Sequence, residues 1–140
     1  MMQEQLAQPK SFDDVWEHCK PYIERAVKRQ DLYSLEDIEC RIRDGIFLLW
    51  PGKQSAMVTE FVEFPQMRTM NLLFCGGNYE ELEGMMPSIE EYCRICNVKR
   101  LHGGGRSGWL RKIPKELGFK SEYIISVSYT HLTLPTILLV

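Results

Sequence analysis

Apolar and polar residues follow a helical spacing in the first third of the chain. Between Ser11 and Val27, and again in the segment "SLEDIECRIRDG", apolar residues recur every three or four positions. Each segment opens with a serine that is followed three residues later by an aspartate, a pattern typical of a helix N-terminus, and the second segment closes at Gly45. We therefore expect two N-terminal helices, preceded by a flexible leader at residues 1–10.

The middle of the chain changes to the pattern of strands. The segments "IFLLW", "SAMVTEFVEF" and "RTMNLLFC" are continuously apolar or alternate between apolar and polar residues. They are separated by "PGKQ" and "PQM", whose proline and glycine residues favour tight turns. Because connections this short join neighbouring antiparallel strands, these segments predict a three-stranded antiparallel meander.

Two helical crossovers follow the meander. The helical segments are "NYEELEGMMPSIEEYCRICN" and "RSGWLRKIPKELG", and the strands after them are "VKRLHG" and "EYIIS". A strand-helix-strand crossover of this length normally joins parallel strands in a right-handed sense. The predicted fold class is therefore α/β (α+β), with two N-terminal helices, a three-stranded antiparallel meander and then helix-strand-helix-strand around one mixed sheet. We assign residues 11–126 to this single domain.

The last fourteen residues, 127–140, differ from the rest of the chain in composition. They read "VSYTHLTLPTILLV", contain no charged residue and resemble the translation of a transposon adaptor used in sequencing libraries. The adaptor codons GTC-TCT-TAT-ACA-CAT spell the stretch from Val127 to His131. We expect a non-native tail that replaces the end of the last strand, and we leave His131 out of the functional candidates.

Composition limits the classes of partner. The chain has 140 residues, of which 44% are hydrophobic, and this suits one domain that buries most of its apolar surface. The 17 basic and 19 acidic residues leave a net charge of -2, so the whole molecule has no positive field to attract nucleic acid or an anionic membrane. No stretch of 18 apolar residues and no signal-peptide core occurs, and we therefore expect a cytoplasmic protein without a membrane partner.

One local run of basic residues leaves a nucleic-acid or partner-binding module as a further alternative. The run "VKRLHGGGRSGWLRK" lacks the series of aromatic residues on which successive single-stranded bases stack, so nucleic acid is not the expected partner. Its basic residues are Lys99, Arg100, Arg106, Arg111 and Lys112.

The five cysteines do not predict a metal site. Cys93 and Cys96 form a C-x-x-C pair, but a zinc site needs two further ligands in a comparable cluster, and His102 is the only nearby candidate. The pair also lies late in a helical segment, whereas a redox pair would lie at a helix N-terminus. We interpret the cysteines as reduced thiols, with these two as small core residues.

The predicted order of elements resembles the GNAT fold of the N-acetyltransferase superfamily, without the first strand of that family. The segments that carry the resemblance are "LWPGKQSAMVTEFVEF", "NLLFCGGNYEEL" and "GGGRSGWLRKIPKELGF", within residues 11–126. The chain also resembles small proteins encoded by tailed phages and prophages, some of which are regarded as GNAT-like virion or virion-associated proteins. This second resemblance implies other virion proteins as partners, and a location in the host cytoplasm or in the virion.

The GNAT resemblance implies acetyl-CoA as the cofactor and two glycine-rich turns as its site. In active members of the family, an Arg/Gln-x-x-Gly-x-Gly/Ala loop after the fourth strand binds the pyrophosphate through backbone N–H groups at a helix N-terminus. Here the turn "CGGNYEEL" lacks the arginine or glutamine, and its glutamates place negative charge on the first helical turn. We expect Asn78 to cap this helix, with Glu81 reaching back to it. The candidate cofactor-binding residues are Gly76, Gly77, Asn78 and Tyr79, and, in the second turn, Gly104, Arg106 and Ser107.

Candidate catalytic residues are few. Acetyl transfer needs a base for the amine, and in this family often a tyrosine on the last helix as the acid, but the corresponding segment 107–117 contains no tyrosine. The candidate bases are Glu60 and Glu63 on the middle meander strand, and His102 at the end of a later strand. Cys75, beside the two glycines, is either a nucleophile or a buried structural thiol.

The sequence thus predicts a phage-associated GNAT-like protein with a non-catalytic structural or accessory role and a degenerate acyl-CoA site. The alternative is an active acetyl-CoA-dependent N-acetyltransferase that acts on a small-molecule or protein amine.

Overall fold

The structure, a computed structural model, describes residues 11–104 and 117–120. The chain divides into two compact units, Met1–Gly105 and Arg106–Val140, and all helices and strands given below belong to the first. In chain order they are α2 (Phe12–Val27), α3 (Leu35–Arg43), β1 (Phe47–Pro51), β2 (Ser55–Glu63), β3 (Arg68–Gly77), α4 (Tyr79–Ile95) and β4 (Arg100–Gly103). The leader, the last predicted helix up to residue 116, the last predicted strand and the tail at 127–140 lie outside the described residues.

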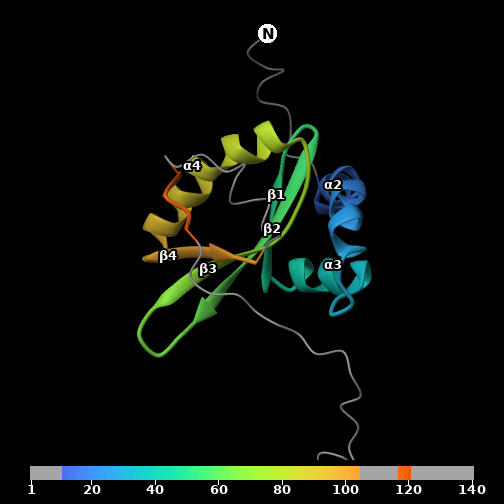
Figure 1. The fold of residues 1–140 in the computed structure, drawn as a ribbon. Coiled ribbons are helices and arrows are strands. Elements are labelled where there is room, and N and C mark those ends of the chain that lie inside the picture. The colour runs from blue at the N-terminus through green and yellow to red at the C-terminus, as the bar shows by residue number, and fades with distance from the viewer. Residues whose placement is uncertain (1–10, 105–116, 121–140) are drawn as a thin grey trace, which may run out of the picture. The chain divides into compact units, whose positions relative to one another are not determined.

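The four described strands form one mixed sheet in the order β1-β2-β3-β4 (Figure 1). The first three are antiparallel neighbours, as short turns require, and β4 pairs with β3 in parallel after the crossover through α4. This parallel pairing runs from Thr69, opposite Arg100, to Leu72, opposite Gly103. The predicted mixed α/β architecture is therefore confirmed, as far as the described residues extend.

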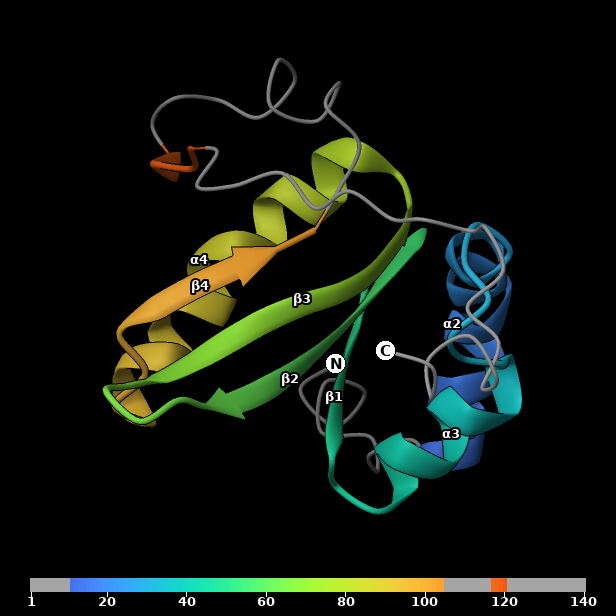
Figure 2. The same ribbon diagram turned by 60° about the horizontal axis from the view of Figure 1, so that its bottom comes forward.

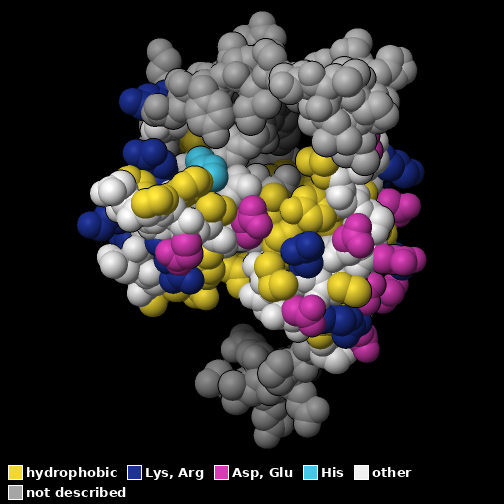
Figure 3. All heavy atoms as spheres, turned by 90° about the horizontal axis from the view of Figure 1, so that it is seen from below, with side chains coloured by type: hydrophobic (Ala, Val, Ile, Leu, Met, Phe, Trp, Pro, Cys, Tyr) yellow, Lys and Arg dark blue, Asp and Glu magenta, His cyan; other side chains and the backbone are white. Residues whose placement is uncertain are grey.

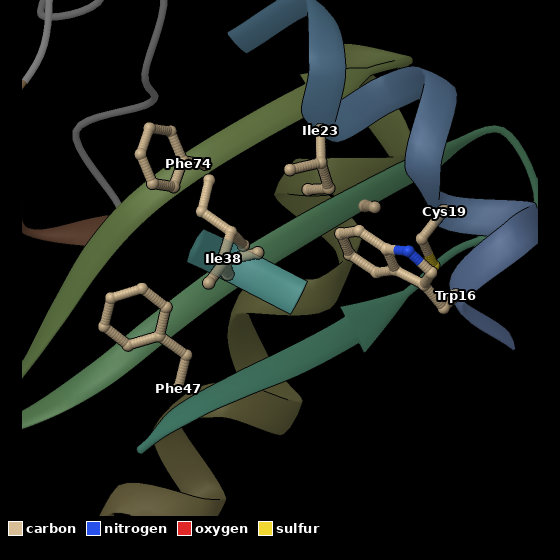
Figure 4. Packing of buried hydrophobic residues seen from close by; sticks show 8 residues of the cluster. Trp16, Cys19, Ile23, Ile38, Phe47 and Phe74 are labelled. Carbon is tan, nitrogen blue, oxygen red and sulfur yellow. The ribbon is translucent and has the colours of Figure 1, made fainter. Parts of the chain in front are cut away.

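Helices α2 and α3 lie to one side of the sheet and α4 to the other (Figure 2). The core beneath α2 and α3 consists of residues that expose 7% of their surface or less, among them Trp16, Ile23, Ile38, Phe47 and Phe74. These five come from two helices and two strands and point toward one another (Figure 4), and Ala56 and Val58 of β2 also belong to the cluster. Burial of these large apolar side chains is the main force that holds the helical pair on the sheet.

A β-bulge in β3 decides which of its side chains reach this core. Val58 of β2 lies opposite Phe74, but the next residue, Thr59, lies opposite Leu72, so Leu73 is an extra residue in β3. Because side chains alternate between the two faces of a sheet, the extra residue moves Phe74 onto the face that α2 covers.

The two glycines at the end of β3 belong to the strand. Gly76 and Gly77 pair with Ala56 and Ser55 of β2, whereas the sequence pattern had ended the strand at Cys75. The pairing of β3 with β2 continues to Gly77 because β2 already begins at Ser55. The strand β3 therefore ends directly before Asn78, the cap of α4.

We predict that Ile38→Ala lowers the free energy of unfolding by about 2 to 4 kcal/mol, since Ile38 is fully buried and its truncation leaves a cavity. Urea denaturation measures the change. The control is Leu32→Ala, at a residue that is 82% exposed, for which we expect a change within about 0.5 kcal/mol. Equal losses in the two variants would contradict the assignment of Ile38 to the core.

Candidate functional site

The junction between β3 and α4 is built by hydrogen bonds to the turn between β1 and β2. The side chain of Asn78 caps α4, since its oxygen accepts a hydrogen bond from the Glu81 N–H at 3.0 Å. The predicted cap is thus present. The N–H of Asn78, however, donates to the carbonyl oxygen of Gln54 at 2.9 Å and not to the Glu81 side chain. The expected reciprocal contact from Glu81 to its own cap was therefore wrong, because the neighbouring turn supplies the acceptor.

The carboxylate of Glu81 instead binds the β1–β2 turn. It accepts hydrogen bonds from the Gln54 N–H at 2.9 Å and from the hydroxyl of Ser55, which is fully buried. These two bonds, the one from Ser55 first, hold the pKa of Glu81 below its ordinary value of 4.5, so the side chain is ionised at neutral pH. Gly52 makes room for it, because a Cβ at that position would overlap the carboxylate.

Gly76 and Gly77 are glycines because other parts of the chain approach them closely. A Cβ added at Gly76 would overlap the carbonyl oxygen of Tyr22 in α2. Gly77 has a φ angle of 105°, which disfavours other residues, and a Cβ there would overlap the carbonyl oxygen of Gln54. A side chain at either glycine would therefore collide with α2 or with the β1–β2 turn.

The first two turns of α4 carry three carboxylates. Glu80 and Glu81 lie in the first turn and Glu83 follows, next to Tyr79. Desolvation, and then the charge and hydrogen bond of Glu83, raise the pKa of the Tyr79 phenol above its ordinary value. Negative charges stabilise a helix N-terminus and repel an incoming anion. The candidate cofactor residues Gly76, Gly77, Asn78 and Tyr79 thus surround an acidic helix start.

Two of the three predicted bases, Glu60 and His102, lie in one row across the sheet. Asn71 of β3 is opposite Glu60 of β2 on one side and opposite His102 of β4 on the other. The Asn71 amide donates a hydrogen bond to the Glu60 carboxylate at 3.2 Å. Asn71 was not a sequence candidate, although a polar residue within the apolar segment "RTMNLLFC" was a signal for it.

His102 is held within this row in a neutral state. A ring nitrogen of His102 lies 2.8 Å from the hydroxyl oxygen of Thr69, which is buried. Burial, and second the positive charge of Arg100, lower the pKa of His102 below its ordinary value of 6.5 against an opposing effect of Glu60. A neutral imidazole can accept a proton, so His102 is a candidate general base within this row.

The remaining catalytic candidates do not join the row. Glu63 has a side chain that is 71% exposed and forms an ion pair with Arg68 at 2.6 Å. Burial raises the pKa of the Cys75 thiol to about 11, which keeps it protonated at neutral pH and counts against a nucleophile. Gly104 is exposed after the end of β4, while Arg106 and Ser107 lie outside the described residues.

The described residues were also compared with the needs of metal sites and membrane spans. Cys93 is buried in α4 and Cys96 caps its C-terminus, and the described residues contain no cluster of three side chains suited to a metal ion. None of the described helices is long and apolar enough to cross a membrane. Acidic and basic side chains are mixed on the face that Figure 3 shows.

Comparison with known proteins identifies the fold. The crystal structure of a probable acetyltransferase matches with a TM-score of 0.63 at 11% identity, over 85% of this chain and 95% of that chain. A wild-type protein of Thermus thermophilus gives 0.59 at 16% identity, over 90% and 98% of the two chains. A tetramutant of a Bacillus halodurans protein gives 0.55 at 10% identity, over 84% and 93%.

The comparisons confirm the GNAT-like, acetyltransferase-like fold. Identities this low show a shared fold and leave the activity open. No protein-family model matches the chain, and no curated protein matches its sequence.

We predict that Gly76→Ala destabilises the protein, because its Cβ would overlap the Tyr22 carbonyl oxygen and force α2 away from the sheet. The matched control is Gly84→Ala within α4, where a Cβ meets no atom within 4 Å. There we expect a gain of about 0.5 to 1 kcal/mol, since alanine favours a helix. Thermal or urea unfolding measures the stability of both variants. If Gly76→Ala were as stable as wild type, the Tyr22 carbonyl oxygen would not exclude a side chain at this position.

We predict that Glu81→Gln weakens the dependence of stability on pH. Because the folded-state pKa of Glu81 lies below 4.5, its ionised form contributes stability above that pH, and the contribution is lost as the pH falls through the folded pKa. The difference in unfolding free energy between wild type and variant should therefore shrink between neutral pH and acid. Glu80→Gln makes the same charge change one residue away and should leave this dependence in place. Parallel pH profiles for wild type and Glu81→Gln would contradict the anchoring role.

Proposed function

We propose that this chain is a GNAT-like protein with a degenerate acyl-CoA site and a non-catalytic, accessory role. The observation that carries the proposal is the Glu81 carboxylate, which is bound by Gln54 and Ser55 at the first turn of α4. This is the turn at which the family resemblance places the pyrophosphate of acetyl-CoA. The similarity to a probable acetyltransferase supports the fold of such a protein.

The residues at this turn do not fit a pyrophosphate. The Asn78 N–H already donates to Gln54, and the Glu81 N–H donates to the Asn78 side chain. A pyrophosphate would also bring its negative charges next to Glu80 and Glu81, where the helix N-terminus is already neutralised. No arginine or glutamine stands at the start of the turn to compensate for this repulsion.

We infer an accessory role because the chain has the fold of an acetyltransferase but lacks the residues that would bind the cofactor at this turn. The resemblance to phage-encoded GNAT-like proteins supports assembly with other virion proteins as that role. It also supports a location in the virion or in the host cytoplasm.

An active N-acetyltransferase is the second candidate, and one observation favours it. Glu60 and His102 lie in one row with Asn71 between them, and His102 is neutral because its pKa is lowered. An amine substrate needs a base of this kind. The row supplies the base, while the turn at α4 does not supply a site for the cofactor.

We predict that acetyl-CoA at about 1 mM shifts the melting temperature of the full chain by less than about 1 °C. A ligand with a dissociation constant of about 10 µM would stabilise the protein by about 2.7 kcal/mol at that concentration and raise the melting temperature by several degrees. Differential scanning fluorimetry makes the comparison, with ATP as the control for unspecific binding of a nucleotide. A shift of several degrees, together with thiol release that requires an amine and disappears in Glu60→Gln, would establish the enzyme instead.

A further inference from the structure

The end of α4 carries two thiols at a fixed spacing. Cys93 lies in the last turn of the helix and Cys96 is its C-cap. Beyond the cap, the Val98 N–H donates to the Cys93 carbonyl oxygen at 2.8 Å, and the Asn97 N–H donates to that of Arg94 at 3.2 Å. These bonds form a Schellman motif, in which Asn97 has the required left-handed conformation with a φ angle of 57°. The helix therefore keeps its geometry as far as Cys96.

This geometry places the two cysteines at a distance that a disulfide can span. Residues three positions apart on an α-helix have Cα atoms roughly 5 Å apart, from the rise and radius of the helix. A disulfide joins Cα atoms that are about 4.4 to 6.8 Å apart. Both cysteines are free thiols in this structure. A disulfide between them thus needs a change of side-chain rotamer and little movement of the backbone.

The two thiols differ in their access to solvent. Cys93 exposes 6% of its surface, and burial is the first cause that raises its pKa. Cys96 is half-buried and lines a groove of about 360 Å³. The Tyr92 hydroxyl forms a hydrogen bond with the Cys96 side chain, which limits the positions that the sulfur can take. A reagent in the groove would therefore react with Cys96 before Cys93.

The groove beside Cys96 carries positive charge and no acidic residue. The β2–β3 loop, the end of α4 and the start of β4 come together there (Figure 2). Lys99 is exposed and forms no ion pair with the described residues, whereas the Nε of Arg68 pairs with Glu63 at 2.6 Å. An anionic reagent is therefore favoured, and Lys99 contributes most to this preference. The residues that line the groove, all within the described part of the chain, are Gln66, Met67, Arg68, Cys96, Asn97 and Lys99.

We propose that Cys93 and Cys96 are a thiol modification site, which a small anionic disulfide such as glutathione disulfide oxidises to an intramolecular disulfide. The Cys96 thiolate attacks one sulfur of glutathione disulfide, so that a mixed disulfide forms and one glutathione leaves as a thiolate. Cys93 then loses its proton and attacks the Cys96 sulfur, which releases the second glutathione. Two protein thiols are oxidised, one disulfide is reduced, and the two thiol protons pass through solvent to the two glutathione molecules.

The position of the pair determines which form persists. A helix N-terminus stabilises a thiolate and so makes a pair easy to reduce. Cys93 and Cys96 lie at the C-terminus of α4, where the helix dipole gives a thiolate no such support. Burial of Cys93 also favours its protonated form. The disulfide, once formed, is therefore retained, and the pair records an oxidation state instead of passing it to other proteins.

Peptide mass mapping of the full chain after incubation with glutathione disulfide tests the proposal. Wild type should gain a disulfide between Cys93 and Cys96, whereas Cys40, which is exposed and is the only cysteine of α3, should retain a bound glutathione. Cys93→Ala should stop at the mixed disulfide on Cys96, because no second thiol resolves it. Cys96→Ser should leave Cys93 unmodified in the time that oxidises wild type. Thermal unfolding checks that both variants are folded.

A charge change tests the groove. Lys99→Glu should slow the oxidation of Cys96 by glutathione disulfide at least about threefold and leave the reaction with uncharged hydroxyethyl disulfide nearly unchanged. The control is Lys28→Glu, the same exchange at an exposed lysine that caps α2.

Two results would overturn the proposal. The first is a chain in which Cys40 becomes modified while Cys93 and Cys96 stay free thiols. The second is an oxidation rate with glutathione disulfide that Lys99→Glu leaves unchanged, since the groove would then not select an anionic reagent. These outcomes do not depend on whether acetyl-CoA binds.

Discussion

The site depends on the two hydrogen bonds that the Glu81 carboxylate accepts. This carboxylate receives them from the backbone of Gln54 and from the hydroxyl of Ser55, and so ties the β1–β2 turn to the first turn of α4. The same turn accepts the Asn78 N–H, and its backbone lies against Gly77. Because an ionised carboxylate at a helix N-terminus is already favourable, the junction is stable without a ligand. The start of α4 thus serves to hold the β1–β2 turn in place.

The fold of this chain is shared more widely than its residues. Structures that are 10% to 16% identical share its arrangement of helices and strands, which shows how little the fold restricts the residues at a site. The row of Glu60, Asn71 and His102 places polar groups on the sheet, whereas the start of α4 is acidic and hydrogen-bonded to other parts of the chain. The accessory role that we propose would account for both observations, since it requires the fold and the surface but not the cofactor turn.

Local patterns predicted the elements, and long-range contacts account for what they missed. The spacing of apolar residues and the Asn78 cap were sufficient for the helices, and short turns for the meander. The role of Gly76 was not predictable, because the carbonyl oxygen that excludes a side chain belongs to Tyr22, more than fifty residues earlier. The row at Asn71 was not predictable either, because it depends on the register between strands. The bulge at Leu73 shifts that register in β3, and the alternation of apolar and polar residues does not reveal it.

The account is tested most directly by following the backbone amide signals of Gly77, Asn78 and Glu81 in nitrogen-15 NMR spectra while acetyl-CoA is added. These amides would be the nearest groups to a bound pyrophosphate. If the β1–β2 turn and the Glu81 carboxylate occupy the helix start, their signals stay in place up to about millimolar acetyl-CoA, well above the dissociation constant of a specific cofactor. Saturable shifts that centre on these amides would show that the turn binds the cofactor and would contradict a degenerate site.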